Sequence, residues 1–105
     1  MVYKYKLTPL AIDDIDEALD YIANYLDNKI AADDLYVSIQ NEISAIRENP
    51  FSFSDCSYYL IEDNKIRHAI VGNYVLFYEV SEKEKLIKVL RFLYGKRLIS
   101  QNTIM

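Results

Sequence analysis

Two stretches of helical apolar spacing, separated by only about three residues, constrain the fold of this chain more than any other feature. In both stretches apolar residues recur every three or four positions, which gathers them on one side of an α-helix. The first set is Ile12, Ile15, Leu19, Ile22 and Leu26, and the second is Ala32, Leu35, Tyr36, Ile39, Ile43 and Ile46. Because the break at residues 27–29 is so short, we predict an antiparallel helical hairpin whose apolar side needs a sheet to cover it.

The rest of the chain supplies the strands for such a sheet. Residues 2–7 alternate between apolar and polar, as a half-buried strand does, and Thr8 and Pro9 then favour an N-cap and a first helical turn. After the hairpin, which we expect to end near Asn49-Pro50, residues 65–71, 74–80 and 86–94 are strand-like. Gly72-Asn73 separates the first two of these runs and predicts a tight turn. Residues 51–64 are expected to form a polar loop that leads into a short extended piece at residues 58–61.

The predicted order is therefore β-α-α-β-β-β, in a single domain that takes in all 105 residues. Helices that come first and strands that follow indicate an α+β class. We expect the helical hairpin to pack on one face of a small antiparallel sheet, which leaves the other face free for a partner.

Composition excludes several classes of site. Cys56 and His68 are the only residues of their types, so neither a disulfide nor a Cys/His zinc site can be assembled, and the two glycines form no phosphate loop. We expect no metal and no cofactor. No apolar run approaches the roughly 20 residues of a membrane span, so we expect a cytoplasmic protein with no membrane partner.

Charge is distributed unevenly along the chain. Residues 11–34 hold eight acids and one lysine, a balance of −7, whereas residues 65–97 hold eight cations and three acids, a balance of +5. The helical segment therefore repels phosphate and the C-terminal segment attracts it. The acids of the sequence DDID, at residues 13–16, are interpreted as helix-capping and helix-dipole groups.

The candidate site residues lie in the basic segment. Tyr94, Lys96 and Arg97 follow one another at the end of the last predicted strand, where the cations could hold a phosphate and the phenol could stack on a base or transfer a proton. Arg67 and His68 stand on opposite sides of an earlier strand. A histidine in an apolar strand is more often a hydrogen-bonded, half-buried ring, so His68 is a secondary candidate.

Three pieces of sequence carry a resemblance to a known family. They are RENP after the second predicted helix, IRHAIVGNYVLFYEV in the middle and IKVLRFLYGKR at the end. With the predicted order of elements, residues 2–98 resemble the RelE/ParE superfamily of type II toxin–antitoxin toxins. The resemblance implies a plasmid-stabilisation or related module in which the toxin arrests growth and a cognate antitoxin wraps an extended or helical segment across the sheet and the hairpin.

What the resemblance implies about activity divides in two. RelE-like members are ribosome-dependent endonucleases that cut mRNA, and ParE-like members inhibit DNA gyrase instead. In the nuclease case Arg97 stands where the family keeps an arginine that holds the scissile phosphate, with Tyr94 and Arg67 as further catalytic candidates. Lys96, Arg91 and His68, together with Arg97, are then the candidates for binding RNA or phosphate.

The sequence favours the ParE-like alternative. It has no cation between Arg67 and Lys83, where RelE-like nucleases carry several, and its long helical hairpin resembles that of ParE-like members. The first hypothesis is therefore a gyrase inhibitor, and the second is a ribosome-dependent mRNA endonuclease. The third is a domain that binds an antitoxin but has weak or no toxicity.

Overall fold

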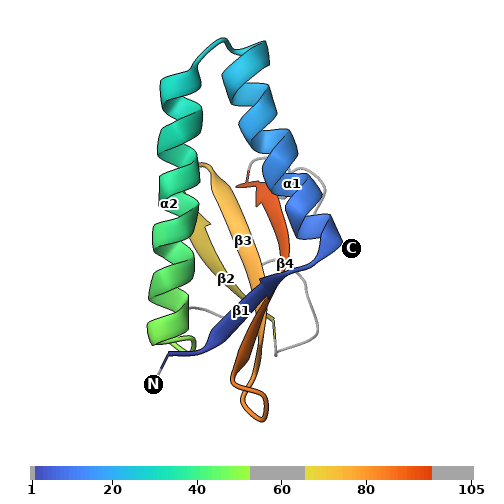
Figure 1. Cartoon of the computed structure of the whole chain (residues 1–105), viewed down its shortest axis with the longest axis vertical. Coiled ribbons are helices and arrows are strands. Elements are labelled where there is room, and N and C mark those ends of the chain that lie inside the picture. Colours follow the sequence, from blue (N-terminus) through green and yellow to red (C-terminus); the bar gives the residue numbers. More distant parts are fainter. Residues whose placement is uncertain (1, 53–65, 96–105) are drawn as a thin grey trace.

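The computed structural model of the chain describes residues 2–52 and 66–95 (Figure 1). The extended piece expected at residues 58–61 lies outside these ranges. Its elements are β1 (Lys4–Leu7), α1 (Pro9–Asp20), the π-helical η1 (Tyr21–Tyr25), α2 (Lys29–Glu48), β2 (Ile66–Val71), β3 (Tyr74–Ser81) and β4 (Leu86–Tyr94). The predicted order β-α-α-β-β-β and the α+β class are confirmed. No helix in residues 2–52 or 66–95 is long and apolar enough to cross a membrane.

In the described part of the chain, the sheet has four strands in the order β1-β4-β3-β2. β3 pairs antiparallel with both of its neighbours, as predicted, but β1 lies parallel to β4, so the sheet is mixed rather than wholly antiparallel. No tight turn joins β1 to its neighbour, because the hairpin and the other two strands come between them in the chain. A connection of that length allows a parallel pair.

The start of the hairpin is fixed by Thr8, as the sequence predicts. Its hydroxyl accepts a hydrogen bond from the Ala11 amide at 3.1 Å and donates one to the Leu90 carbonyl at 2.9 Å. Thr8 therefore caps α1 and ties it to β4 at the same time. At the far end, Asp27 adopts a φ of 51° and the Asn28 side chain accepts from the Ala31 amide at 3.0 Å, which caps α2 after the reversal.

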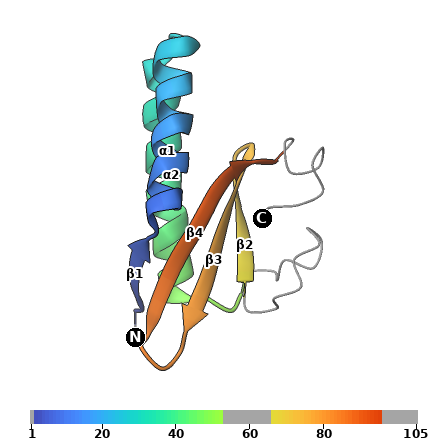
Figure 2. The same cartoon turned by 90° about the vertical axis from the view of Figure 1, so that its right-hand side faces the viewer.

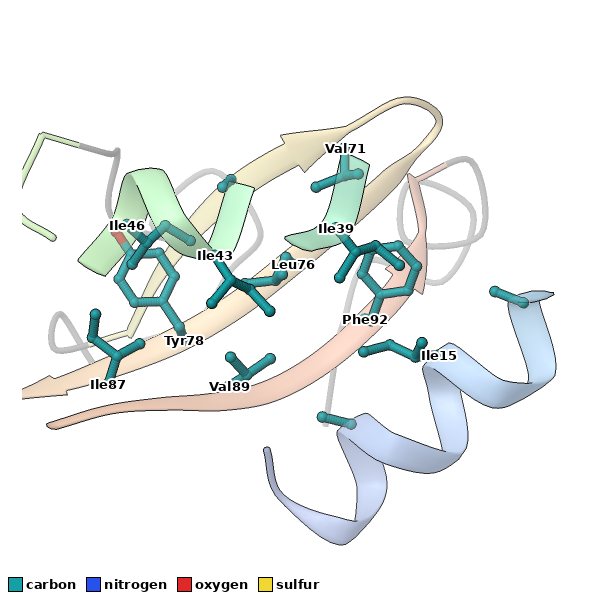
Figure 3. Close-up of a cluster of buried hydrophobic side chains, with 13 residues drawn as sticks. Ile15, Ile39, Ile43, Ile46, Val71, Leu76, Tyr78, Ile87, Val89 and Phe92 are labelled. Carbon is teal, nitrogen blue, oxygen red and sulfur yellow. The ribbon is translucent and has the colours of Figure 1, made fainter. Parts of the chain in front are cut away.

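The core lies between the hairpin and one face of the sheet (Figure 3). From α1 it takes Ala11, Ile15 and Ala18; from α2 it takes Ile39, Ile43 and Ile46; and from the strands it takes Ala69, Val71, Leu76, Tyr78, Ile87, Val89 and Phe92. The apolar side predicted for α1 was partly wrong, since Ile12 and Leu26 are 44% and 52% exposed. Two alanines face the core instead because they let α1 approach β4 closely. Leu26 belongs to the connection between η1 and α2, and this end of the hairpin projects past the strands (Figures 1 and 2).

A bulge in β4 lets both halves of this strand face the core. Tyr78 pairs with Val89 and Phe77 pairs with Arg91, so Leu90 is the extra residue. An inserted residue shifts the alternation of side chains by one position. As a result Val89 before the bulge and Phe92 after it are both buried.

The face of the sheet away from the helices is less open than expected. Val75 and Phe77 alternate with the core residue Leu76, yet they are 3% and 1% exposed. Ile70, which pairs with Val75 from the edge strand β2, is 57% exposed. The prediction of a free second face was therefore wrong along β3, and exposed apolar surface on that face is found at the β2 edge.

Candidate functional site

Four of the six predicted site residues lie in the described part of the chain. They are Arg67, His68, Arg91 and Tyr94, whereas Lys96 and Arg97 lie outside it. The roles given to Lys96 and Arg97 stay predictions. The other four can be placed in the fold one by one.

Arg91 is held by an acidic side chain of α1. Its Nε donates to Asp14 Oδ2 at 2.7 Å and its second terminal nitrogen donates to Asp14 Oδ1 at 3.1 Å. This hydrogen bonding raises the pKa of Arg91, against the opposing effect of burial. The Asp14 side chain is only 9% exposed and that of Arg91 is 26% exposed. The Arg91 guanidinium is therefore engaged in a bidentate ion pair within the fold.

Asp14 also closes an open edge of the sheet. Its Oδ2 accepts a hydrogen bond from the Phe92 amide at 3.0 Å, on a stretch of β4 that β1 no longer covers after the Leu7–Val89 pair. An unpaired edge amide needs such an acceptor. The interpretation of Asp14 as a capping or dipole group was therefore wrong: the first turn of α1 holds no acid, and Asp14 joins α1 to β4.

Arg67 and His68 stand on opposite faces of β2. Arg67 pairs with the core residue Tyr78, and its guanidinium carbon lies 5.1 Å from the centre of the Phe51 ring. His68 pairs with Phe77 on the other face, with 6.4 Å between the two ring centres. Arg67 therefore belongs to the helix-facing side of the sheet, near the end of α2, and His68 belongs to the far side.

Tyr94 lies at the opposite end of the sheet from Arg67. It pairs with Tyr74, whereas Arg67 pairs with Tyr78 on the same strand. Four residues of strand span about 13 Å, and β2 and β4 are separated by the width of two strand spacings, about 10 Å. The structure therefore does not bring Arg67 and Tyr94 together, and it brings neither of them to Arg91.

Tyr94 instead belongs to a set of four tyrosines, which we call the tyrosine cluster. Its ring meets that of Tyr74 edge-on, with 5.4 Å between centres, and Tyr74 stacks on the core residue Phe92 at 4.8 Å. Tyr21 and Tyr25 of η1 stack on each other at 5.0 Å, and Tyr21 lies close enough to Tyr74 to affect its titration. The cluster thus runs from the end of β4 to η1.

Sequence reasoning missed most of this cluster. It assigned Tyr74 to the sheet and gave Tyr94 a possible functional role, but it overlooked Tyr21 and Tyr25. Their spacing of four residues, which places two side chains on one side of a helix, was the available signal. The π-helical turn of η1 carries both rings, and such turns occur often at functional sites.

With this geometry in hand, the sequence can be compared with known proteins. The family model described as "ParE toxin of type II toxin-antitoxin system, parDE" matches residues 5–99. The chain belongs to the ParE toxin family. The predicted membership of the RelE/ParE superfamily is confirmed. No curated protein matches the sequence in a direct search.

Solved structures with the same fold come from toxin–antitoxin systems. The chromosomal ParDE system of P. aeruginosa matches with a TM-score of 0.70 and 17% identity, over 89% of this chain and 96% of that one. The RelBE2 toxin–antitoxin complex of Mycobacterium tuberculosis gives 0.64 and 14%, over 90% and 99%. The archaeal RelE–RelB complex of Pyrococcus horikoshii OT3 gives 0.58 and 19%, over 92% and 99%. At such low identities these likenesses establish the fold alone.

Metal chemistry has no visible basis in the described part of this ParE-family toxin. Across residues 2–52 and 66–95, no group of three or more His, Cys, Asp and Glu side chains could hold a metal ion. The α1 acids Asp13, Asp16, Glu17 and Asp20 are exposed, whereas the Asp14 side chain is largely buried and forms an ion pair with Arg91.

The tyrosine cluster predicts a specific alkaline titration. Burial raises the pKa of the Tyr74 phenol above its ordinary value of 10.0, and the nearby Tyr94 and Tyr21 raise it further. Since the folded pKa exceeds the unfolded one, the stability that Tyr74 contributes is complete below about pH 10 and is lost as pH rises through the folded pKa. Ultraviolet titration of the native toxin should therefore show that Tyr74 ionises later than an ordinary exposed tyrosine.

Two variants identify that tyrosine. The difference between the wild-type and Tyr74→Phe titrations should contain one late step, and Tyr94→Phe should move this step to lower pH because one of the neighbouring charges is gone. Tyr36→Phe, at an exposed position of α2 outside the cluster, should leave the late step unchanged. A Tyr74→Phe titration that is identical to the wild-type one above pH 10 would contradict the assignment.

Proposed function

We propose that this ParE-family toxin arrests growth by inhibiting DNA gyrase and that it cuts no RNA. One observation carries the choice: the candidate site residues that the structure describes do not converge on a common point. Arg91 is occupied by Asp14, while Arg67 and His68 lie on opposite faces of β2. A nuclease needs several groups placed around one phosphate. The family match over residues 5–99 supports the same choice.

A cognate antitoxin is the second part of the proposal. The fold neighbours were solved as ParDE and RelBE systems, in which toxin and antitoxin are partners. Within residues 2–52 and 66–95, β2 is the last strand of the sheet and exposes Ile70, which offers apolar surface to such a partner. We expect the antitoxin to cover this edge and the hairpin in an extended or helical form.

The ribosome-dependent endonuclease stays the alternative because of Arg97. This arginine matches the position that holds the scissile phosphate in RelE-like nucleases, and the fold is shared with two RelE proteins. In that case the toxin enters the ribosome with mRNA, and Lys96 and Arg97 act without Arg91. A domain with weak or no toxicity is the third alternative, and the acidic hairpin is the feature that favours it.

One pair of measurements separates these alternatives. The toxin is induced in cells, mRNA 5′ ends are mapped and the supercoiling of a plasmid is measured at the same time points. We expect relaxed or broken plasmid DNA with intact mRNA, and growth restored when the antitoxin is co-expressed. Codon-phased mRNA cuts that disappear in Arg97→Ala would contradict the proposal, and growth unaffected by induction would favour the third alternative.

A further inference from the structure

Three lysines lie together on the face of the sheet away from the helices. Lys6 of β1 pairs directly with Lys88 of β4, and Lys4 precedes Lys6 by two residues. The alternate residues Ile87 and Val89 face the core, so the three lysines are on the opposite face. Directly paired side chains have Cβ atoms about 4.5–5.5 Å apart, and residues two apart on a strand are separated by about 7 Å. We call these three residues the lysine patch.

The charges of the lysine patch are not neutralised within the described part of the chain. Lys4 and Lys6 are exposed and Lys88 is partly exposed, and none of the three forms an ion pair in residues 2–52 or 66–95. Glu79 is opposite Lys88 in the strand register, but the two side chains form no ion pair. Because like charges directly opposite each other destabilise a sheet, the pair of Lys6 with Lys88 does not serve the stability of the fold.

Arg47 adds a further cation at the outer edge of β1, where α2 ends beside this strand (Figure 1). Its carbonyl accepts a hydrogen bond from the Tyr3 amide at 3.2 Å, and its Nε donates to the Tyr3 carbonyl at 2.7 Å. Its guanidinium carbon lies 5.2 Å from the centre of the Tyr5 ring. These contacts hold the guanidinium beside the lysine patch and engage only its Nε among described residues, so its terminal nitrogens can donate to an anion.

We propose that the lysine patch and Arg47 bind the phosphate backbone of duplex DNA that the toxin's target holds. Lysine and arginine side chains bind phosphates without reading the base sequence. The helical hairpin, which carries the acidic residues 11–34, packs on the other face of the sheet. The sheet therefore separates these acids from a phosphate at the lysine patch, and the uneven charge orients the toxin with its lysines toward DNA.

The inference rests on the proposed function, because it takes DNA gyrase as the target. It adds that the toxin contacts gyrase and its bound DNA at the same time. By linkage, a toxin that binds gyrase more tightly in the presence of DNA also makes gyrase hold DNA more tightly. This agrees with the broken plasmid DNA that we expect on induction. A second copy of the chain is a poor occupant, because pairing through β1 would bring lysines against lysines.

The test compares two variants with equal changes of net charge. In the first, Lys4→Gln and Lys6→Gln remove two charges from the lysine patch. In the control, Lys29→Gln and Lys83→Gln remove two exposed charges elsewhere, at the start of α2 and between two glutamates of the β3–β4 loop. Both variants replace exposed side chains with polar ones, so circular dichroism and Tm should stay close to wild type.

Binding of labelled toxin to purified DNA gyrase, with and without a bound DNA duplex, provides the readout. The duplex should strengthen the binding of wild type and of the control by about tenfold, and the first variant should lose most of this gain. Each lost phosphate contact makes the slope of log affinity against log salt shallower by about 0.9, so the first variant should differ from the control by about two. Binding to gyrase without DNA should be the same for all three proteins.

The possible failures are distinguishable. Wild-type toxin that neither binds nor inhibits gyrase would overturn the proposed function together with this inference. Wild-type toxin that inhibits gyrase but gains nothing from DNA, or a first variant with the same gain as the control, would overturn the inference and leave gyrase as the target. If the first variant instead binds DNA-free gyrase or the antitoxin more weakly and keeps its gain from DNA, the lysine patch contacts an acidic protein surface and the inference is wrong.

Discussion

Asp14→Ala is expected to lower the free energy of unfolding by about 2–3 kcal/mol. The change removes the two hydrogen bonds to the Arg91 guanidinium and the one to the Phe92 amide. It leaves a partly buried cation and an edge amide without their acceptor. The loss of stability would be larger if the pair were fully buried. The Arg91 side chain is 26% exposed, so water partly compensates the unpaired guanidinium.

Matched variants separate the contributions of the pair. Asp14→Asn keeps an oxygen for the Phe92 amide and loses the charge, so its cost should be intermediate. Arg91→Met removes the cation, and the double variant with Asp14→Ala should lose less than the sum of the two single changes. Asp16→Ala, at an exposed position two residues away, should stay within about 0.5 kcal/mol of wild type.

Urea unfolding followed by circular dichroism measures these differences. If Asp14→Ala is no less stable than Asp16→Ala, the contact between α1 and β4 does not contribute as the geometry indicates. The comparison also bears on function, because Arg91 was a candidate for binding phosphate. A pair that stabilises the fold explains this arginine without a ligand.

The sequence predicted the elements that local signals specify. Thr8 and Pro9 indicate where α1 begins, the three-residue break indicates the reversal, and Gly72 adopts the positive φ, of 60°, that a tight turn between β2 and β3 requires. These signals act over a few residues. Combined with the order of strands, they were enough for the fold class and for the family.

The contacts between distant segments could not be predicted in the same way. Asp14 and Arg91 are separated by 77 residues, and nothing in the DDID sequence distinguishes Asp14 from its neighbours. The parallel pairing of β1 depends on where the hairpin leaves the sheet. The bulge at Leu90 reverses which residues of β4 face the core, although the run of apolar residues there is continuous.

The candidate site residues were also predicted correctly where local signals place them, and not where contacts between distant segments do. Arg67 and His68 were predicted on opposite faces of one strand, and their pairing with Tyr78 and Phe77 agrees with that. Their distance from Tyr94 depends on the register of three strands, which alternation alone does not fix. The tyrosine cluster joins residues from α1's extension, β3 and β4, so it could be recognised only once these elements were placed.

Phe92→Ala is expected to have the largest effect on stability, a loss of about 3–5 kcal/mol. The ring is 2% exposed and faces the hairpin only because the bulge turns it inward. Its removal leaves a cavity among core residues and takes away the stacking partner of Tyr74. Domains of this size are stable by roughly 5–15 kcal/mol, so the variant should be close to unfolding in mild urea.

Phe92→Leu and Ile70→Ala supply the controls. Phe92→Leu keeps most of the apolar volume, so it should cost clearly less than Phe92→Ala. Ile70→Ala, at a side chain that is 57% exposed, should cost less than about 1 kcal/mol. Phe92→Leu should also move the late tyrosine ionisation to lower pH, because Tyr74 loses the ring that covers it. A Phe92→Ala protein as stable as Ile70→Ala would mean that the bulge does not turn the Phe92 ring into the core.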